Sequence, residues 1–298
     1  MTITPDDTAL FDPRSLSGQP VAWRCLCCGH ADLRSSPAIL MPFVAHRARG
    51  RAPVVIDESW GLKTVQAGTA HSICASLYCP ECGFLFLDDR FSDREMANLY
   101  RDYRGPEYNA LREQYEPGYT ARNETLKAGI DYLDRIEQFL EPWLSFPLNV
   151  LDWGGDTGRN TPFKGRHGDF HVYDISTKPV IEGAKFVERN EIADGQYGLV
   201  VCSNVLEHVP YPADLIHHMK PALNEASVLY IEVPFEDVTR LHDTDLHLKK
   251  RHWHEHINFF SARSLQRLLD HCGLEILAYG TLPISTGNVQ QIACRLKR

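Results

Sequence analysis

The sequence lacks any long run of hydrophobic residues, since no uninterrupted apolar stretch approaches the roughly 20 residues that a membrane-spanning helix needs. It also lacks the basic start and apolar core of a secretory signal, because residues 1–20 contain acids and prolines instead. Both absences argue against a membrane or exported protein. We therefore expect a soluble chain located in the cytoplasm.

Basic side chains are also scarce: the 298 residues include 31 Lys and Arg against 39 Asp and Glu, a formal net charge of −8. The only compact basic run is Lys249-Lys250-Arg251. Extended nucleic-acid binding needs many Lys and Arg contacts to phosphate, so this balance disfavours a nucleic-acid partner. A hydrophobic fraction of 43% excludes a wholly disordered chain and allows a real core.

Cysteine, by contrast, is clustered: six of the nine cysteines lie between residues 25 and 82. In a chain without an export signal, such clustering points to thiolate or metal chemistry before disulfides. Residues 25–29 and residues 79–83 both read as C-x-x-C-G, the turn in which two thiolates bind one cation. The repeated turn predicts a structural four-thiolate zinc site on Cys25, Cys28, Cys79 and Cys82.

The roles of two further cysteines in this region stay open. Cys27 offers a less usual pairing with Cys25, and Cys74 is a spare thiol close to the second turn. Residues 30–78, between the two turns, carry short apolar patches separated by Gly and Pro, which predicts short strands and loops. We expect an N-terminal tail over residues 1–24, followed by a zinc-binding module over residues 25–91.

A helical connecting region is expected over residues 92–146, where apolar residues recur at three- and four-residue steps. Ser92 with Glu95 has the pattern of a helix cap. A further amphipathic helix is expected from Leu126 to Leu140, ending at Pro142. Residues 100–119 carry five tyrosines interleaved with arginines, which would either line a polar ligand pocket or pack one irregular surface.

From residue 147 the pattern changes to alternating strands and helices. A strand over residues 148–152 ends in Asp152 and runs into a glycine-rich turn, residues 153–158, with a helix expected next. A second strand ends in Asp174, about 20 residues later, where such folds hydrogen-bond a ribose. Strands at 199–203, 226–233, 274–281 and 289–296, with helices at 212–223 and from Ser261, complete a doubly wound α/β sheet. Its ligands should sit at the carboxyl ends of the strands.

Residues 147–298 resemble the class I S-adenosylmethionine-dependent methyltransferases. The resemblance rests on the turn from Asp152 to Gly158, on Asp174, and on Val205-Leu206-Glu207-His208-Val209. It implies a Rossmann-like sheet with an antiparallel last strand, and S-adenosylmethionine as cofactor. It assigns cofactor binding to Asp152, Trp153, Gly154, Gly155, Asp156, Gly158, Asp174, Ile175, Ser203 and Asn204.

Two positions depart from the family pattern. Asp156 replaces the middle glycine of the usual G-x-G-x-G, and Gly198 stands where an acid normally begins the fourth strand. An acid at position 156 suits the ammonium and the cationic sulfonium of S-adenosylmethionine. It disfavours an anionic pyrophosphate, and therefore NAD.

The amino-terminal part resembles the zinc-binding front end of sugar C-methyltransferases, since two C-x-x-C-G turns are followed by an apolar stretch at residues 84–87 and a Tyr-rich helix. Those enzymes act on nucleotide-linked deoxysugars. In them a Tyr-His-Glu-His segment takes part in proton abstraction, and the resemblance places this role on Glu255 and His256. An imidazole beside a carboxylate suits it, because its pKa lies near the operating pH.

Non-catalytic interpretations of these histidines stay open. Residues 252–261 form either the catalytic segment or a structural loop, and a second metal site is disfavoured because H-x-E-x-H lacks the H-E-x-x-H spacing. His208 either packs beneath the cofactor or acts in catalysis.

The motifs together predict an S-adenosylmethionine-dependent methyltransferase of sugar biosynthesis, acting on a carbohydrate such as a nucleotide-linked sugar, or on a related polar small molecule. C- and O-methylation are both open. One alternative is an RNA base methyltransferase, with Arg101, Arg104 and Arg112 on a basic aromatic face. Another is a non-catalytic, zinc-stabilised interaction protein that retains the fold, which the departures at Asp156 and Gly198 would favour.

Overall fold

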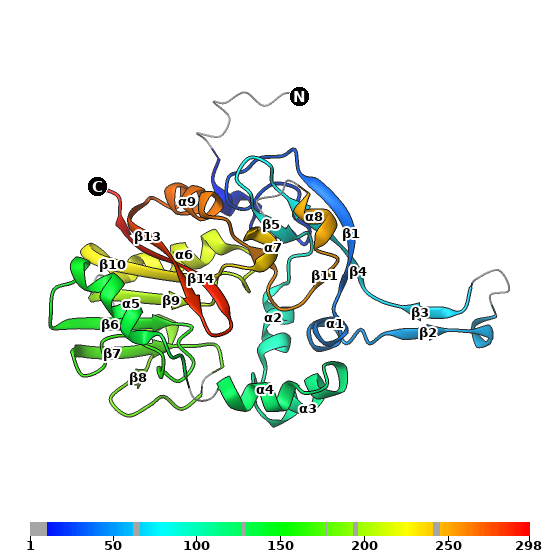
Figure 1. Cartoon of the computed structure of the whole chain (residues 1–298), viewed down its shortest axis with the longest axis horizontal. Helices are drawn as coiled ribbons and strands as arrows, with labels where there is room; N and C mark the ends of the chain where they lie inside the picture. Colours follow the sequence, from blue (N-terminus) through cyan, green and yellow to red (C-terminus); the bar gives the residue numbers. More distant parts are fainter. Residues whose placement is uncertain (1–10, 62–65, 127–128, 177, 193–195, 241–244) are drawn as a thin grey trace.

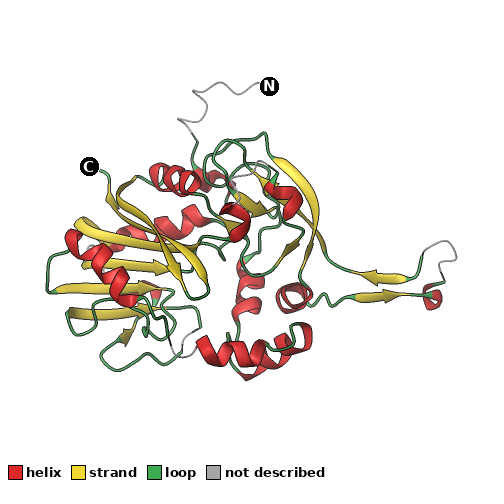
Figure 2. Ribbon diagram, in the orientation of Figure 1, coloured by secondary structure: helices red, strands yellow, loops and turns green. Residues whose placement is uncertain are grey.

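The computed structural model describes residues 11–61, 66–126, 129–176, 178–192, 196–240 and 245–298. These residues form a seven-stranded sheet, a five-stranded sheet and a two-stranded sheet, with helices packed around the two larger ones (Figures 1 and 2). A two-stranded hairpin, β2 (Val54–Ile56) and β3 (Gly68–Ala70), projects from the rest (Figure 1). None of the helices in this described part of the chain has the length and apolar character needed to cross a bilayer.

The larger sheet has seven strands in the order β13-β14-β10-β9-β6-β7-β8. Their bounds are β6 (Leu148–Trp153), β7 (His167–Tyr173), β8 (Lys185–Phe186), β9 (Tyr197–Ser203), β10 (Leu223–Pro234), β13 (Leu274–Ile284) and β14 (Gly287–Leu296). Neighbouring strands from β8 to β10 are parallel, whereas β14 is antiparallel to both β10 and β13. The predicted α/β sheet with an antiparallel last strand is confirmed, and its strand order reverses between β6 and β9.

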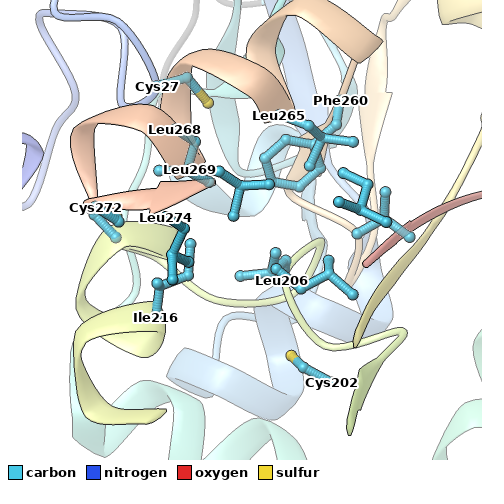
Figure 3. Packing of buried hydrophobic residues seen from close by; sticks show 14 of the residues in the cluster. Cys27, Cys202, Leu206, Ile216, Phe260, Leu265, Leu268, Leu269, Cys272 and Leu274 are labelled. Carbon is cyan, nitrogen blue, oxygen red and sulfur yellow. The ribbon is translucent and has the colours of Figure 1, made fainter. Parts of the chain in front are cut away.

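Helices cover both faces of this sheet. Helix α5 (Leu133–Leu140) packs Ile136 and Leu140 on one face, against strand residues such as Val150. Helices α6 (Pro212–Met219) and α9 (Ala262–His271) pack on the other, against Leu151 and its neighbours. Figure 3 shows Ile216 of α6 and Leu268 of α9 in this core. Successive residues of β6 thus enter opposite cores, as the two-residue period of a strand requires.

The smaller sheet joins distant parts of the sequence. Its order is β11-β1-β4-β5-β12, with β1 (Arg34–Leu40), β4 (Ile73–Tyr78) and β5 (Leu85–Leu87) from the amino-terminal module. The two edge strands, β11 (His252–Trp253) and β12 (Asn258–Phe259), come from the carboxyl-terminal half. Residues 254–257 therefore connect the two edge strands of the amino-terminal sheet.

Several short elements connect the sheets. The helices are α1 (Pro42–Arg49), α2 (Asp93–Tyr100), α3 (Pro106–Tyr115), α4 (Tyr119–Leu126), α7 (Asp237–Arg240) and α8 (Leu246–Lys249). Single 3-10 turns lie at Pro13–Leu16, Glu58–Trp60, Glu141–Trp143, Arg189–Glu191 and Lys220–Ala222. Ser92 and Glu95 form the predicted capping box of α2. Helix α1 was not expected in a stretch predicted to hold only strands and loops.

Two helix predictions were wrong. The amphipathic pattern from Leu126 to Leu140 is not one helix, because α4 ends at Leu126 and α5 begins at Leu133. Between them Gly129 has a φ of +88°, a left-handed conformation that stops a right-handed helix. The helix expected after the glycine-rich turn is also missing, since residues 154–166, all described, form turns, bends and irregular loop.

Candidate functional site

The glycine-rich turn follows β6 at the carboxyl edge of the sheet, beside the switch point between β6 and β9. Gly154 has a φ of +79°, and a β-carbon there would lie 2.5 Å from Cγ2 of Val205. Gly158 has a φ of +77°, and its β-carbon would lie 2.9 Å from Phe170 and Val172. Both positions therefore exclude a side chain on steric as well as conformational grounds. In place of a helix, a bond of 2.8 Å from Gly158 N–H to the Gly155 carbonyl closes the turn.

Asp174, directly after β7, is tied to this turn. One carboxylate oxygen accepts a hydrogen bond from the N–H of Asp156 at 2.9 Å, and the other accepts one from the N–H of Ser176 at 2.7 Å. The neighbouring Ile175 is 61% exposed, an apolar side chain held at the sheet edge. The structure thus brings together three of the predicted cofactor residues.

A cavity of about 340 Å³ opens beside the turn. Its lining is polar and contains charges of both signs: Arg104, Asn123, Gly129, Gly155, Asp156, Thr157, Arg159, Asn160 and Lys178. Within it, Lys178 Nζ lies 2.7 Å from the carboxylate of Asp156. Such a lining complements a zwitterion, because cations and an anion are presented a few ångströms apart. The departure of Asp156 from glycine therefore places a negative charge in this cavity.

The predicted residue Asp152 lies beneath the turn and not at its surface. It is 4% exposed and accepts a hydrogen bond from the Thr161 hydroxyl. Burial raises the pKa of its carboxyl to about 7, against the smaller lowering effect of that hydrogen bond. Asp152 therefore supports the turn from below.

Ser203 and Asn204, predicted at the end of β9, meet an acid that sequence reasoning missed. Glu232 on β10 is fully buried, and one oxygen accepts bonds of 2.9 Å each from Ser203 Oγ, Asn204 Nδ2 and the Tyr132 hydroxyl. Its other oxygen accepts a hydrogen bond of 2.8 Å from the Tyr230 hydroxyl. The only sequence signal was a lone acid inside a buried strand. This network fixes the polar end of β9 against β10.

The three predicted catalytic residues lie in one partly buried cluster, in which Glu255 is buried and the side chains of His208 and His256 are 15% and 25% exposed. The ring of His256 lies 4.6 Å from that of His208 and 5.0 Å from that of His254, measured between centroids. The ring centroid of Tyr100, the last residue of α2, lies 5.8 Å from that of His208. Because Glu255 and His256 lie on the connection between β11 and β12, the second sheet presents them to the loop after β9.

The Glu255 side chain pairs with a residue from α3. Its Oε1 lies 2.5 Å from Arg112, which also binds Glu116 at 3.0 Å. Burial would raise the pKa of Glu255, but Arg112 and His254 outweigh it and hold the pKa at about 2. Glu255 is thus a permanent anion that anchors its segment to α3. Among the described residues, the ring of His256 has no hydrogen bond to the Glu255 carboxylate.

The carboxylate beside His256 is Glu236, whose Oε1 lies 2.9 Å from Nδ1 of His256. Burial lowers the pKa of His256, but the bond to Glu236 and the charge of Glu207 outweigh it and leave this pKa raised. His208 and His254 have the opposite shift, since burial and the neighbouring His256 lower the pKa of each to about 3. Of these three rings, His256 alone favours a proton.

Glu207 completes the cluster. It is 2% exposed, and neither carboxylate oxygen has a hydrogen-bond partner among the described residues. Burial raises its pKa to about 7. One ligand atom each from Glu207, His208 and His256 lie within 4.8 Å of one another, a spacing that would also suit a metal ion. Nε2 of His208 lies 3.7 Å from Glu207 Oε1, and a buried carboxylate without a hydrogen bond needs a positive partner, which a protonated imidazole or a cation supplies.

The four predicted zinc ligands converge in the amino-terminal module. The sulfurs of Cys25, Cys28, Cys79 and Cys82 are buried and lie within 4.8 Å of one another. Both turns have the same backbone geometry: Gly29 and Gly83 have φ values of +74° and +75° and donate N–H bonds to the first cysteine of their own turn. The donor set therefore fits a tetrahedral thiophilic metal. Cys27 lies outside it and packs in the hydrophobic core beside α9 (Figure 3).

Comparison with known proteins identifies the family. Residues 122–279, more than half of the chain, match the family model described as methyltransferase domain. The chain therefore belongs to this methyltransferase family and is an S-adenosylmethionine-dependent methyltransferase. No curated protein matches it.

Solved structures similar to the chain include three methyltransferases. A 1,6-didemethyltoxoflavin-N1-methyltransferase from Burkholderia thailandensis, bound to its substrate and S-adenosylhomocysteine, shares 18% identity over 64% of this chain and 90% of its own, with a TM-score of 0.47. A putative methyltransferase from Bacillus halodurans shares 12% identity over 56% of this chain and 99% of its own, with a TM-score of 0.43. A Methanosarcina mazei S-adenosylmethionine-dependent methyltransferase shares 18% over 54% and 98%, with a TM-score of 0.38.

Proposed function

We propose that this enzyme methylates a carbohydrate, such as a nucleotide-linked sugar, or a related polar small molecule, and that His256 removes a proton from the acceptor. The observation that carries this is the partly buried cluster of His208, His254 and His256, next to Tyr100. A polar acceptor with an acidic C–H or O–H matches a site built from imidazoles and a phenol. Methyl transfer itself requires alignment of the acceptor with the methyl group.

The residues at the sheet edge fit S-adenosylmethionine. Asp174 would bind the ribose and the exposed Ile175 would cover the adenine, while the turn at residues 153–158 would run along the methionine end. The cavity beside the turn supports this, because Asp156 would face the ammonium and Arg104 or Lys178 the carboxylate. When bound, the cofactor supplies a methyl group on a cationic sulfur.

Within the cluster the three predicted catalytic residues receive different roles. The neutral ring of His256 would accept the acceptor's proton. Glu255 would hold the segment in place through Arg112, and His208 would pack against the His256 ring and line the acceptor site.

We also propose that the module holds one structural zinc ion on Cys25, Cys28, Cys79 and Cys82. Four buried sulfurs within 4.8 Å of one another support this, and the Cys25–Cys82 and Cys28–Cys79 sulfur pairs are each 3.5 Å apart. All four positions are taken by protein, so the metal would stabilise the module and not bind substrate.

An RNA acceptor is less well supported. Arg112 is 8% exposed and bound to two glutamates, so it is not available on a basic surface. RNA binding requires such cations to be exposed together with aromatic rings. The carbohydrate or small polar acceptor is therefore preferred.

The proposal is tested with S-adenosylmethionine labelled on its methyl group. Purified enzyme is incubated with nucleotide-linked sugars and keto-sugars, and products are separated and analysed by mass spectrometry. Release of tritium from a labelled acceptor carbon identifies C-methylation, whereas methylation without release from carbon identifies O-methylation. If label passes to RNA and to no sugar tested, the proposed acceptor class is wrong.

A further inference from the structure

Glu236 lies just beyond β10 at the carboxyl edge of the sheet and belongs to no motif in the sequence. Its side chain is 28% exposed and meets His256, 25% exposed, at 2.9 Å between Oε1 and Nδ1. We propose that Glu236 is the positioning residue for His256, fixing its tautomer and stabilising its protonated form. This inference rests on the proposed function, in which His256 takes the acceptor's proton.

The hydrogen bond determines which ring nitrogen reacts. A carboxylate only accepts, so Nδ1 of His256 must carry the hydrogen. In the neutral ring the lone pair then resides on Nε2, which is the nitrogen left for the acceptor. His208 is held similarly, because its Nδ1 lies 3.0 Å from the Glu255 carbonyl oxygen. A neutral carbonyl, however, stabilises an imidazolium less than a carboxylate does. Glu236 therefore distinguishes His256 from His208 as the proton acceptor.

The surrounding charges agree with this role. His256 faces Glu236 from the end of β10, Glu207 and His208 from the loop after β9, and His254 and Glu255 from its own segment. Lys250 on the preceding segment lies near Glu236, and Arg112 balances Glu255. Glu236, hydrogen-bonded to the His256 ring, and Glu207, which has no hydrogen-bond partner among the described residues, both favour a charge on His256. The two adjacent imidazoles remain neutral because a second positive ring would be repelled.

In the proposed step one proton moves from the acceptor to His256. The C–H or O–H bond of the acceptor breaks, its proton bonds to Nε2 of His256, and its electron pair remains on the acceptor atom that receives the methyl group. The products are the methylated acceptor, S-adenosylhomocysteine and a protonated His256. The imidazolium then returns its proton to water.

The test compares wild type with Glu236→Gln by NMR of protein labelled with ¹⁵N on histidine, and the His256 signals are identified by their loss in His256→Asn. In wild type we expect Nε2 to be the unprotonated nitrogen of the neutral ring. In Glu236→Gln the titration midpoint of His256 should fall by about one pH unit, because the anionic partner is gone. Glu236→Asp should recover part of this shift.

Kinetics provides a second readout. With a methylated acceptor in hand, Glu236→Gln should lower kcat by about 10–100-fold while the KM for S-adenosylmethionine stays unchanged. The acidic limb of the kcat profile should move with the NMR midpoint, which a purely structural role would not cause. Glu95→Gln is the matched control, since Glu95 is 25% exposed, pairs with Arg49 and lies outside the cluster. It should change neither readout.

Two results would overturn the inference. An unchanged tautomer and midpoint in Glu236→Gln would show that Glu236 does not control His256. A second tightly bound metal per chain, lost in Glu207→Gln and accompanied by a His256 that no longer titrates, would show that the cluster is a metal site. Failure to methylate any carbohydrate would instead count against the proposed function, because the NMR measurement needs no acceptor.

Discussion

The N–H of Asp156 donates a hydrogen bond of 2.9 Å to the carboxylate of Asp174, which joins the glycine-rich turn after β6 to the end of β7. A helix usually supports such a turn, but here residues 154–166 form none. Asp174 therefore has two tasks: it orders the turn from within the protein and presents its carboxylate at the proposed ribose site. Its removal should affect the cofactor both directly and through the turn.

Asp174→Ala should weaken S-adenosylmethionine binding by about 1–3 kcal/mol, because charge-assisted hydrogen bonds are lost. Isothermal titration calorimetry measures the affinity. Asp169→Ala is a suitable control, since Asp169 is an exposed acid on the same strand. Equal affinities for wild type and Asp174→Ala would refute the placement of the ribose.

Purified protein should contain one zinc ion per chain, and Cys82→Ser should lose it and destabilise the amino-terminal module, because three thiolates leave an incomplete site. Inductively coupled plasma mass spectrometry gives the metal content, and thermal unfolding gives the stability. Cys74→Ser provides the comparison: Cys74 is buried in the same sheet but outside the four-sulfur cluster. Zinc-free protein prepared without chelators would contradict the assignment.

His256→Asn should cut turnover by about 10²–10⁴-fold and leave S-adenosylmethionine affinity nearly unchanged, because a general base acts on the acceptor. Turnover is followed by methyl transfer to the acceptor, and affinity by calorimetry. His218→Asn, an exposed histidine on α6, should behave like wild type. Should His256→Asn retain full turnover at neutral pH, the segment is structural and His208 becomes the residue to test.

Asp152 should make stability fall as pH rises. Its folded-state pKa of about 7 lies above that of an unfolded aspartate, so the folded state binds the extra proton and is favoured at low pH. Between about pH 4 and pH 7 this contribution is lost, by up to about 4 kcal/mol for a shift of this size. Urea unfolding of wild type and Asp152→Asn across this range measures it. The difference between the two unfolding free energies should decrease steadily, whereas parallel curves would exclude the raised pKa.

Local patterns predicted much of the fold. The strand, glycine turn and terminal acid around Asp152, the cap at Ser92 and the two C-x-x-C-G turns each depend on residues a few positions apart, so their structure follows from sequence. The missing helix after Gly158 shows the limit of such reasoning. The turn there is held by Asp174 and by close contact of Gly154 with Val205, neither of which is visible in the local pattern.

The sequence by itself determined the strand pattern of the α/β sheet and the four cysteines that converge, and it proposed His208, Glu255 and His256 as separate catalytic candidates. Only the tertiary structure decided which side chains pair with one another in the cluster that these three residues share. Strands β11 and β12 place Glu255 and His256 between the edges of the amino-terminal sheet, so that Glu255 meets Arg112 and His256 meets Glu236. The physical reason is that a carboxylate's partner depends on which strands pair and in what register, and two-residue strands leave no periodic signal in the sequence.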